Sequence, residues 1–387
     1  MHLIDFSANF ISKIIPIALS LAGLGLLITI HEFGHFFFCK IFKVNTPTFS
    51  IGFGPQIFQK KIGNTNFRLA IIPFGGYVEI AGLAEVGQGD QQQSKDTGEN
   101  SFDKKWYWQK FFILIGGILF NLLFAYTIFC ALILFTPKST YGGLKITQLA
   151  KDAPAEKYGV QINDMVVGIN TIKLDQQDPE IILEDYKKLL TEIRSNPGQK
   201  IELFVRRGEE IKQLDIILNT VKESGKDIGK MGASFEPQMP KMSFFKSIKM
   251  GIRRTNEVIV GLIVGIQKMF TSHSLEGTMG PIMIISHGAD FAKAGVLALL
   301  MFLALLSISL AVMNLLPIGA LDGGQLLFVT IEAIIRRKIP ETIKLVINLA
   351  SWVLILGLAI YLSVQELKQL FWPSIKNLSC KVLGLFR

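Results

Sequence analysis

The apolar stretch at residues 14–39, IIPIALSLAGLGLLITIHEFGHFFFC, decides the class of this protein because His31, Glu32 and His35 lie inside it. Its length exceeds the roughly 20 residues that a helix needs to cross the hydrocarbon core of a bilayer. A cleaved signal peptide is the alternative, but the run is too long for one and ends without a small-residue cleavage site. The sequence therefore predicts a retained transmembrane helix that carries ionisable groups.

Three more apolar runs of comparable length predict three more transmembrane helices. They occupy residues 111–137, 294–321 (helical to about 316) and 345–365. Half of the chain is hydrophobic and only 18% of it is charged, whereas roughly a quarter of an ordinary soluble domain is charged. The predicted fold class is a polytopic α-helical membrane protein with four transmembrane helices.

The formal net charge of +9 is concentrated beside the apolar runs, which indicates a bilayer surface and argues against a nucleic-acid partner. Loops 40–110 and 316–344 are rich in lysine and arginine, so the positive-inside rule places both loops in the cytoplasm and both chain termini outside it. The basic C-terminal tail counts against this orientation. The three cysteines are too scattered to predict a disulfide framework or a cysteine metal site.

The first connection, residues 45–81, alternates short extended pieces with glycines and predicts a small sheet. Its second half, FRLAIIPFGGYVEI at residues 67–80, is rich in β-branched and aromatic residues around a Pro-Phe-Gly-Gly turn. A sheet so close to a transmembrane helix can lie at membrane depth only where protein buries it. Residues 86–105 have the composition of a flexible polar linker.

The region 138–230 predicts an inserted α+β domain. Its short strands, its turns and a helix at about 183–195 follow one another as in a PDZ domain, whose open sheet edge captures extended peptides by strand addition. A generic α+β spacer is the alternative. The predicted organisation is a first half of the membrane core at 1–137, the PDZ-like domain at 138–230, a linker at 231–293 with an interfacial amphipathic helix at 241–270, and a second half of the core at 294–387.

The motif HEFGH at residues 31–35 predicts a metal site. On a helix, positions i and i+4 share a face, so His31 and His35 can reach one metal ion. Glu32 projects beside them, where it can take a proton from a metal-bound water. A charge at the centre of an apolar helix costs roughly 2.5–3.5 kcal/mol even on a lenient insertion scale, so these groups need a partner. A divalent cation is the simplest partner.

A catalytic zinc with two histidine ligands needs a third protein ligand and keeps its fourth position for water. The candidate is Asp322 in the stretch NLLPIGALDGG at residues 314–324, where Pro317 and Gly319 interrupt the helix and present the carboxylate on an irregular segment. The alternative is an aspartate that caps a helix at the membrane surface. The predicted topology places this carboxylate and the histidines at similar depth.

Two asparagines lie in apolar surroundings near the predicted site. Asn314 begins the stretch that carries Asp322, and Asn121 lies in the middle of the second apolar run. Both are candidates for hydrogen bonds to an extended substrate strand. Asparagine also joins membrane helices without a catalytic role, and for Asn121 both interpretations stay open.

These motifs, together with Gly-Phe-Gly-Pro at 52–55, the glycine pair at 116–117 and Gly-Pro-Ile at 280–282, resemble the site-2 protease family of intramembrane zinc metalloproteases. The similarity is greatest to its bacterial RseP-like branch and extends over nearly the whole chain. The better-known relatives have two tandem PDZ domains, whereas this chain has room for one.

The resemblance implies roles for individual residues. His31, His35 and Asp322 would bind one zinc ion, Glu32 would act as the general base, and Asn314 would hold the substrate backbone. Residues 45–81 would form a membrane-reentrant β-hairpin that helps to present the substrate strand. Hydroxide formed from the zinc-bound water would then attack a peptide carbonyl of a locally unwound substrate helix.

Family members cut single-span membrane proteins, among them anti-sigma factors already trimmed by another protease, and remnant signal peptides. The resemblance therefore implies such substrates, an upstream site-1-type protease and the bacterial inner membrane. The PDZ-like domain would lie outside the cytoplasm and the active site toward the cytoplasmic side. Two rival classes are a non-enzymatic PDZ adaptor with a structural zinc, which would need a fourth protein ligand, and a zinc enzyme that acts on lipid.

Overall fold

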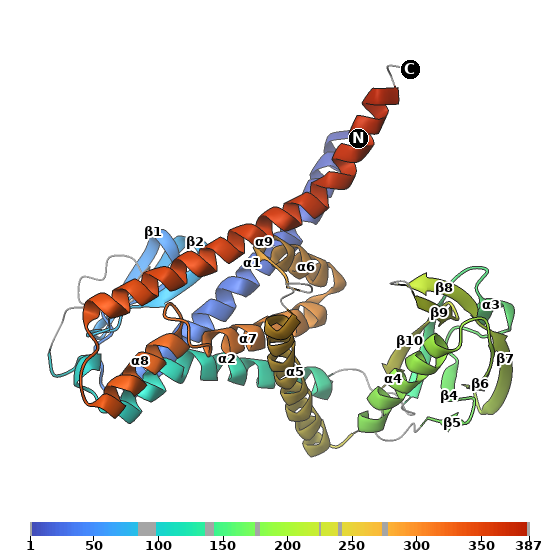
Figure 1. Cartoon of the computed structure of the whole chain (residues 1–387), viewed down its shortest axis with the longest axis horizontal. Coiled ribbons are helices and arrows are strands. Elements are labelled where there is room, and N and C mark those ends of the chain that lie inside the picture. Colours follow the sequence, from blue (N-terminus) through green and yellow to red (C-terminus); the bar gives the residue numbers. More distant parts are fainter. Residues whose placement is uncertain are drawn as a thin grey trace. The chain divides into compact units, whose positions relative to one another are not determined.

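The computed structural model describes residues 2–83, 98–135, 143–174, 179–223, 226–238, 242–272 and 278–384 (Figure 1). The chain forms two compact units. The helical unit combines Met1–Leu132 with Gly251–Arg387, and the inserted unit is Ile133–Met250. The helical unit is thus assembled from both ends of the chain.

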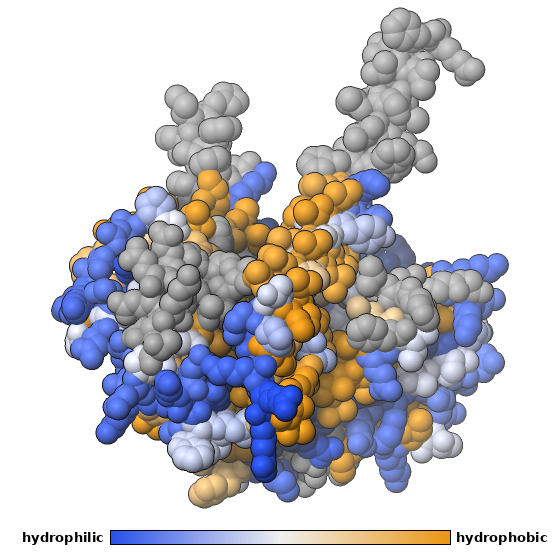
Figure 2. Space-filling model, turned by 60° about the vertical axis from the view of Figure 1, so that its left-hand side comes forward, coloured by the Kyte–Doolittle hydropathy of each residue, from blue (hydrophilic) through white to orange (hydrophobic). Residues whose placement is uncertain are grey.

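Four helices of the helical unit are long and apolar enough to cross a membrane, as the apolar runs predict. They are Ser12–Ile41 within α1 (His2–Ile41), Tyr107–Phe135 (α2), Val296–Asn314 (α7) and Glu341–Gln369 within α9 (Glu341–Gly384). Large aliphatic side chains are exposed on them, such as Val353 (72%) and Ile360 (65%) on α9. Figure 2 shows hydrophobic side chains gathered on the molecular surface. Such a surface is typical of helices that face lipid.

Two further helices of this unit are absent from the sequence prediction, namely α6 (Pro281–Ala294) and α8 (Asp322–Ile335). The third apolar run is helical only to Asn314, because Pro317 disfavours helical geometry in the residue before it and lacks an amide hydrogen. The chain is irregular up to Leu321. The sequence predicts Asp322 on this irregular segment, whereas in the structure Asp322 begins α8.

The glycine pair after Asp322 belongs to the first turn of α8. A Cβ added to Gly323 would lie 2.5 Å from the carbonyl oxygen of Leu316. The glycines therefore let the start of α8 pack directly on the backbone of the irregular segment before it. This contact fixes where the Asp322 carboxylate lies.

Helices α1 and α2 approach closely because glycines meet at their crossing. A Cβ added to Gly116 would lie 2.6 Å from the carbonyl oxygen of Gly34, so neither position has room for a side chain. A buried apolar cluster beside the crossing joins both helices to the hairpin that follows α1. It consists of Cys39, Val44, Phe49, Val78, Ile80, Phe102, Ile113 and Leu114.

The structure confirms the predicted hairpin. Strand β1 (Thr48–Ile62) pairs antiparallel with β2 (Thr65–Val78), with several register shifts along the pair. Apolar side chains such as Ile57 and Phe58 are 65% and 59% exposed, so the hairpin offers an apolar surface. Its depth in a membrane stays a prediction. Most of the predicted linker at 86–105 lies outside the described residues, and its end holds the short helix η1 (Phe102–Lys104).

The inserted unit is an antiparallel sheet with the strand order β10-β3-β4-β6-β7, in which β5 also pairs with β4, and a separate β8-β9 pair. Its elements are β3 (Gly143–Leu149), α3 (Pro154–Lys157), β4 (Met165–Ile169), β5 (Ile172–Lys173), α4 (Pro179–Ser195), β6 (Lys200–Arg207), β7 (Glu210–Ile217), β8 (Asn219–Glu223), β9 (Lys226–Lys230) and β10 (Ala233–Gln238). Aliphatic side chains from the sheet and from α4, among them Leu189 and Leu203, form its core.

The boundaries of the inserted domain differ from the predicted 138–230. Residues 138–142 lie outside the described residues, and the sheet continues to β10, beyond residue 230. The sequence of β10, ASFEPQ, contains a proline and lacks clear alternation, so it reads as linker. The proline is tolerated because β10 is an edge strand.

Helix α5 (Phe244–Ser272) is one continuous helix where the sequence predicts an amphipathic one at 241–270. Val258, Ile259 and Leu262 pack against a buried cluster that includes Phe129 on α2 and Ile308 on α7. The helix is not among the four candidate spans. Its location at a membrane surface stays a prediction.

Candidate metal centre

His31, His35 and Asp322 meet in the helical unit, although they come from opposite ends of the chain. The Nε2 atoms of the histidines lie 3.1 Å and 3.4 Å from Oδ2 of Asp322, and 3.3 Å from each other. A tetrahedral zinc ion with donor bonds of about 2.0–2.1 Å holds its donors about 3.3–3.4 Å apart. The three atoms therefore form one face of a tetrahedron of the size that zinc requires.

The Asp322 carboxylate has the environment of a metal ligand. Its Oδ2 atom is buried and accepts no hydrogen bond from the described residues. A buried carboxylate oxygen without a partner is costly, so a cation in contact with it is stabilising. The position of Asp322 in the first turn of α8 also favours its negative charge, because the positive end of the helix dipole lies there. The donor set thus fits zinc.

His35 is held in the orientation that a metal ligand needs. Its Nδ1 lies 2.8 Å from the carbonyl oxygen of Ile113 on α2. A carbonyl can only accept, so Nδ1 carries the proton and donates it. The lone pair is then on Nε2, the atom that faces Asp322. Sequence reasoning missed Ile113, because its backbone carbonyl is the group that accepts the hydrogen bond from His35. Any residue type supplies such a carbonyl.

His31 is contacted by Asn121 at Nδ1, the ring nitrogen that does not face Asp322. The amide nitrogen Nδ2 of Asn121 lies 3.2 Å from Nδ1 of His31, while its oxygen Oδ1 is buried and has no hydrogen-bond partner among the described residues. The two amide atoms have almost the same shape, and rotating the amide by half a turn exchanges them. Oδ1 then accepts a hydrogen bond from Nδ1–H of His31. That arrangement gives Oδ1 a hydrogen-bond donor and leaves Nε2 of His31 free to bind a metal.

The two candidate asparagines thus lie at opposite edges of one imidazole ring. The Nδ2 atom of Asn314 is 3.3 Å from Nε2 of His31, on the side of the ring that faces Asp322. Asn121 lies at Nδ1, away from that side. Asn314 therefore borders the space in which a metal ion and a substrate would meet. Contact of either side chain with substrate stays a prediction.

Glu32 is buried beside the three candidate ligands and interacts electrostatically with all of them. Its Oε2 accepts a hydrogen bond of 3.1 Å from the backbone N–H of Val78 at the end of β2. The hairpin therefore reaches the site and fixes one oxygen of the candidate base. The sequence places the hairpin near this helix, but it carries no signal for a backbone contact of this kind.

A glycine supplies space directly beside both imidazoles. A Cβ added to Gly117 on α2 would lie 2.5 Å from Nε2 of His35 and 2.5 Å from Cε1 of His31. Atoms in proteins do not approach so closely without overlap. Any side chain at Gly117 would thus displace the rings from their present positions.

Polar groups on α8 and α9 support the irregular segment before Asp322. Nε2 of Gln325 donates hydrogen bonds to the carbonyl oxygen of Gly319 at 2.7 Å and to Oδ1 of Asn348 at 3.3 Å. Asn348 is buried, as is Ser351 one turn later on α9. Sequence reasoning missed this group, and the available signal was the presence of polar residues in the fourth apolar run.

The motifs, the fold and this geometry agree with a comparison against protein families. The model of peptidase family M50 matches residues 19–358. The chain belongs to peptidase family M50, the site-2 protease family. The predicted resemblance is thus confirmed, and the chain is a zinc metalloprotease by family.

Relatives in other bacteria are similar over nearly their full length. A protein of Clostridium perfringens is 30% identical over 91% of this chain and 98% of its own length. One of Nostoc sp. is 29% identical over 91% of this chain and 95% of its own, and one of Campylobacter jejuni is 27% identical over 94% and 95%. Each is named "Putative zinc metalloprotease". Together with the four apolar helices, the family indicates a membrane protein.

Among solved structures, the chain is similar to the PDZ domain of an SdrC-like protein from Listeria monocytogenes. The identity is 19%, the match covers 26% of this chain and 93% of that one, and the TM-score is 0.20.

Proposed function

We propose that this protein cleaves single-span membrane proteins within or beside the bilayer, with one zinc ion bound by His31, His35 and Asp322. The observation that carries the proposal is the triangle of donor atoms, with edges of 3.1–3.4 Å, among helices apolar enough to cross a membrane. Histidine pairs and a carboxylate with one open position are the ligand pattern of catalytic zinc.

Within this proposal each side chain has a separate task. A zinc ion bound at the site supplies a Lewis acid, which lowers the pKa of water and polarises a peptide carbonyl. Glu32 accepts the proton of the attacking water and later delivers it to the leaving amine. The N–H of Val78 holds Oε2 of Glu32, so the proton transfers fall to Oε1. Asn314 donates a hydrogen bond to the substrate backbone, whereas Asn121 positions His31.

The substrate must reach the site in extended form, because the amide bonds of a helix are sterically closed to attack. The contact between β2 and Glu32 supports a role for the hairpin in presenting that extended strand. Outside the membrane, the inserted unit has the strand β10 at the edge of its sheet, beside α4. We therefore propose that it acts as a PDZ domain and pairs peptides with this edge. Anti-sigma factors trimmed by a site-1-type protease and remnant signal peptides are the proposed substrates.

The proposed location is the bacterial inner membrane. The basic loops that follow α1 and that join α8 to α9 support a cytoplasmic location for these ends under the positive-inside rule. The site then lies toward the cytoplasmic side, because the histidines are in the last third of α1. The inserted unit is assigned to the opposite side of the membrane.

A structural zinc in a non-enzymatic adaptor is the rival function. Structural zinc sites are closed by four protein ligands, whereas the described residues offer three histidine or acidic ligands here. A fourth coordination position open to water favours the enzyme.

The test compares two variants of the purified full-length protein on a single-span substrate in proteoliposomes. Glu32→Gln removes the base and keeps the zinc ligands, so we expect this variant to bind one zinc ion per chain. Its rate of cleavage should fall by about 10²–10⁴-fold. Asp322→Ala removes a ligand, so both zinc content and cleavage should be lost. Cleavage by Glu32→Gln at the wild-type rate would refute the assignment of the base. Retention of zinc by Asp322→Ala would refute the ligand set.

A further inference from the structure

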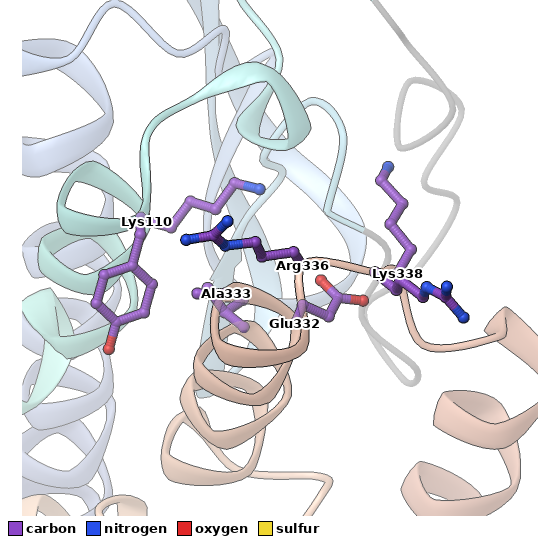
Figure 3. Close-up of a pocket in the computed structure, with 8 residues that line it drawn as sticks. Lys110, Glu332, Ala333, Arg336 and Lys338 are labelled. Atoms are coloured by element: carbon purple, nitrogen blue, oxygen red, sulfur yellow. The ribbon is translucent and has the colours of Figure 1, made fainter.

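A cavity of about 250 Å³ lies in the helical unit, away from the metal centre, between the start of α2 and the end of α8 (Figure 3). The polar side chains that line it are Tyr107, Lys110, Glu332, Arg336, Arg337 and Lys338. Four of them are cations and one is an anion, so the lining carries a formal charge of +3. A cavity with this charge attracts an anion.

The ion pairs near the cavity leave three of its cations without a salt-bridge partner, although Lys110 also lies 5.5 Å from the centre of the Phe102 ring. Lys338 binds Asp103 at 3.2 Å, and Glu332 is engaged by Lys344 at 2.8 Å. Among the described residues, Lys110, Arg336 and Arg337 form no ion pair. Figure 3 shows Lys110 and Arg336 extending toward each other from the two helices. Two like charges that converge repel each other unless an anion lies between them.

The backbone supports the same conclusion. Arg336 ends α8 in the left-handed region, with φ 55° and ψ 28°. Glycine is the usual residue at such a helix end, because a side chain there is strained. The left-handed residue ends α8, and its side chain is a guanidinium that lines the cavity. Strained residues of this kind often mark binding sites.

The position of the cavity points to a lipid. Two of the four candidate spans begin beside it, α2 at Tyr107 and α9 at Glu341. Trp106 and Trp108, which flank Tyr107, are 76% and 53% exposed, as in the aromatic belts at membrane interfaces. Val329 and Ala333 supply an apolar wall on α8. The cavity thus combines cations with an apolar wall beside the ends of two candidate spans.

We propose that this cavity binds the phosphate group of an anionic phospholipid of the cytoplasmic leaflet, such as phosphatidylglycerol. The phosphate would accept hydrogen bonds from Lys110 and Arg336, for which a guanidinium is well shaped. The glycerol and the start of the acyl chains would lie along Val329 and Ala333. Basic pockets between helices on the cytoplasmic side are suited to such headgroups.

Bound lipid would connect the two helices that support the metal centre. Lys110 lies one turn before Ile113, whose carbonyl oxygen holds His35. Arg336 ends the helix that begins with Asp322. A phosphate between Lys110 and Arg336 therefore ties α2 to α8. This consequence rests on the proposed zinc site, whereas the binding of lipid does not.

The experiment measures lipid binding to the purified full-length protein by native mass spectrometry, independently of zinc and of cleavage. The probes are phosphatidylglycerol and phosphatidylcholine with the same acyl chains. We expect the wild type to bind one phosphatidylglycerol about tenfold more tightly than phosphatidylcholine. Arg336→Gly should lose that preference and still fold, because glycine suits the left-handed backbone. Arg336→Lys should keep most of it, and Lys104→Gln, outside the cavity, should keep all of it.

Three results would overturn the proposal. Equal affinity of the wild type for the two lipids would show that the protein does not recognise the anionic headgroup. Equal binding of phosphatidylglycerol by Arg336→Gly and the wild type would show that the lipid does not bind in this cavity. Displacement of phosphatidylglycerol by millimolar inorganic phosphate would identify a site for free phosphate instead of a lipid site. Resistance to that competition is the result we expect.

Discussion

The helical unit and the inserted unit distribute polar and apolar side chains in opposite ways. The inserted unit buries aliphatic side chains such as Leu203 and keeps ion pairs such as Arg194–Glu223 on its surface. The helical unit exposes aliphatic side chains and buries His31 and Asn121. Buried polar groups depend on one another and on a metal, whereas an aliphatic core depends on packing alone. Substitutions in the two units should therefore have separable effects on zinc and on folding.

Among residues that would not bind zinc themselves, the largest effect on zinc affinity is expected at Gly117, where no side chain fits. Gly117→Ala places a methyl group about where the imidazoles of His31 and His35 now lie. The rings must move, and because zinc tolerates only small errors in donor position, affinity should fall on the order of 100-fold or more. Zinc affinity is measured by competition with a chromophoric chelator, using the purified protein in detergent.

Gly357→Ala is the matched control for this change. Gly357 lies in α9, another candidate span, and a Cβ added there would meet nothing within 4 Å. This variant should bind zinc as the wild type does. If the two variants had equal affinity for zinc, the close packing of α2 behind the histidines would be irrelevant to the metal centre.

A smaller effect is expected at Asn121, which touches His31 but would not touch the metal. Asn121→Leu removes the acceptor for Nδ1–H of His31 and should lower zinc affinity about 10–100-fold, as for other groups that support a metal ligand. Asn121→Asp keeps an oxygen in the same place and should restore most of the affinity. With cobalt in place of zinc, the visible spectrum should shift in Asn121→Leu, since the ligand field responds to His31. If the cobalt spectrum and the zinc affinity of Asn121→Leu were both the same as those of the wild type, Asn121 would only join helices.

How far the sequence predicts this site depends on which atoms act. His31, Glu32 and Asp322 stand out because ionisable groups are rare in or beside apolar runs. The carbonyl of Ile113 and the N–H of Val78 give no such signal, because every residue but proline has both groups. For Asn121, the sequence shows a polar residue in an apolar run but not the direction of its side chain.

Parts of the fold escaped prediction for similar reasons. Helix α8 begins at Asp322 with two glycines, which have a low helix propensity, so the start of a helix gave no local signal there. The strand β10 has no clear alternation, and its place in the sheet depends on pairing with the distant β3. The cavity between Lys110 and Arg336 joins residues that are far apart in sequence. Local patterns carry no information about such pairings.

The smallest effect on zinc is expected from the inserted unit. Leu203 is fully buried in β6, and Leu203→Ala should destabilise this unit by about 2–5 kcal/mol through the cavity that it leaves. Limited proteolysis should then cut between β3 and β10 more rapidly than in the wild type. Zinc affinity should stay the same, because the ligands and their supports all lie in the helical unit.

Ile211→Ala on β7 is the matched control for Leu203→Ala. Ile211 is mostly exposed, so its truncation should change stability by less than about 0.5 kcal/mol and leave proteolysis unchanged. If Leu203→Ala lost zinc as well as resistance to protease, the two units would fold as one, and the separation of packing from metal binding would be wrong. If it kept zinc but cleaved substrates with large external domains less selectively, the inserted unit would act in choosing substrates and not in the chemistry. We expect that second outcome, since an insertion with its own aliphatic core can unfold without moving α1, α2 or α8.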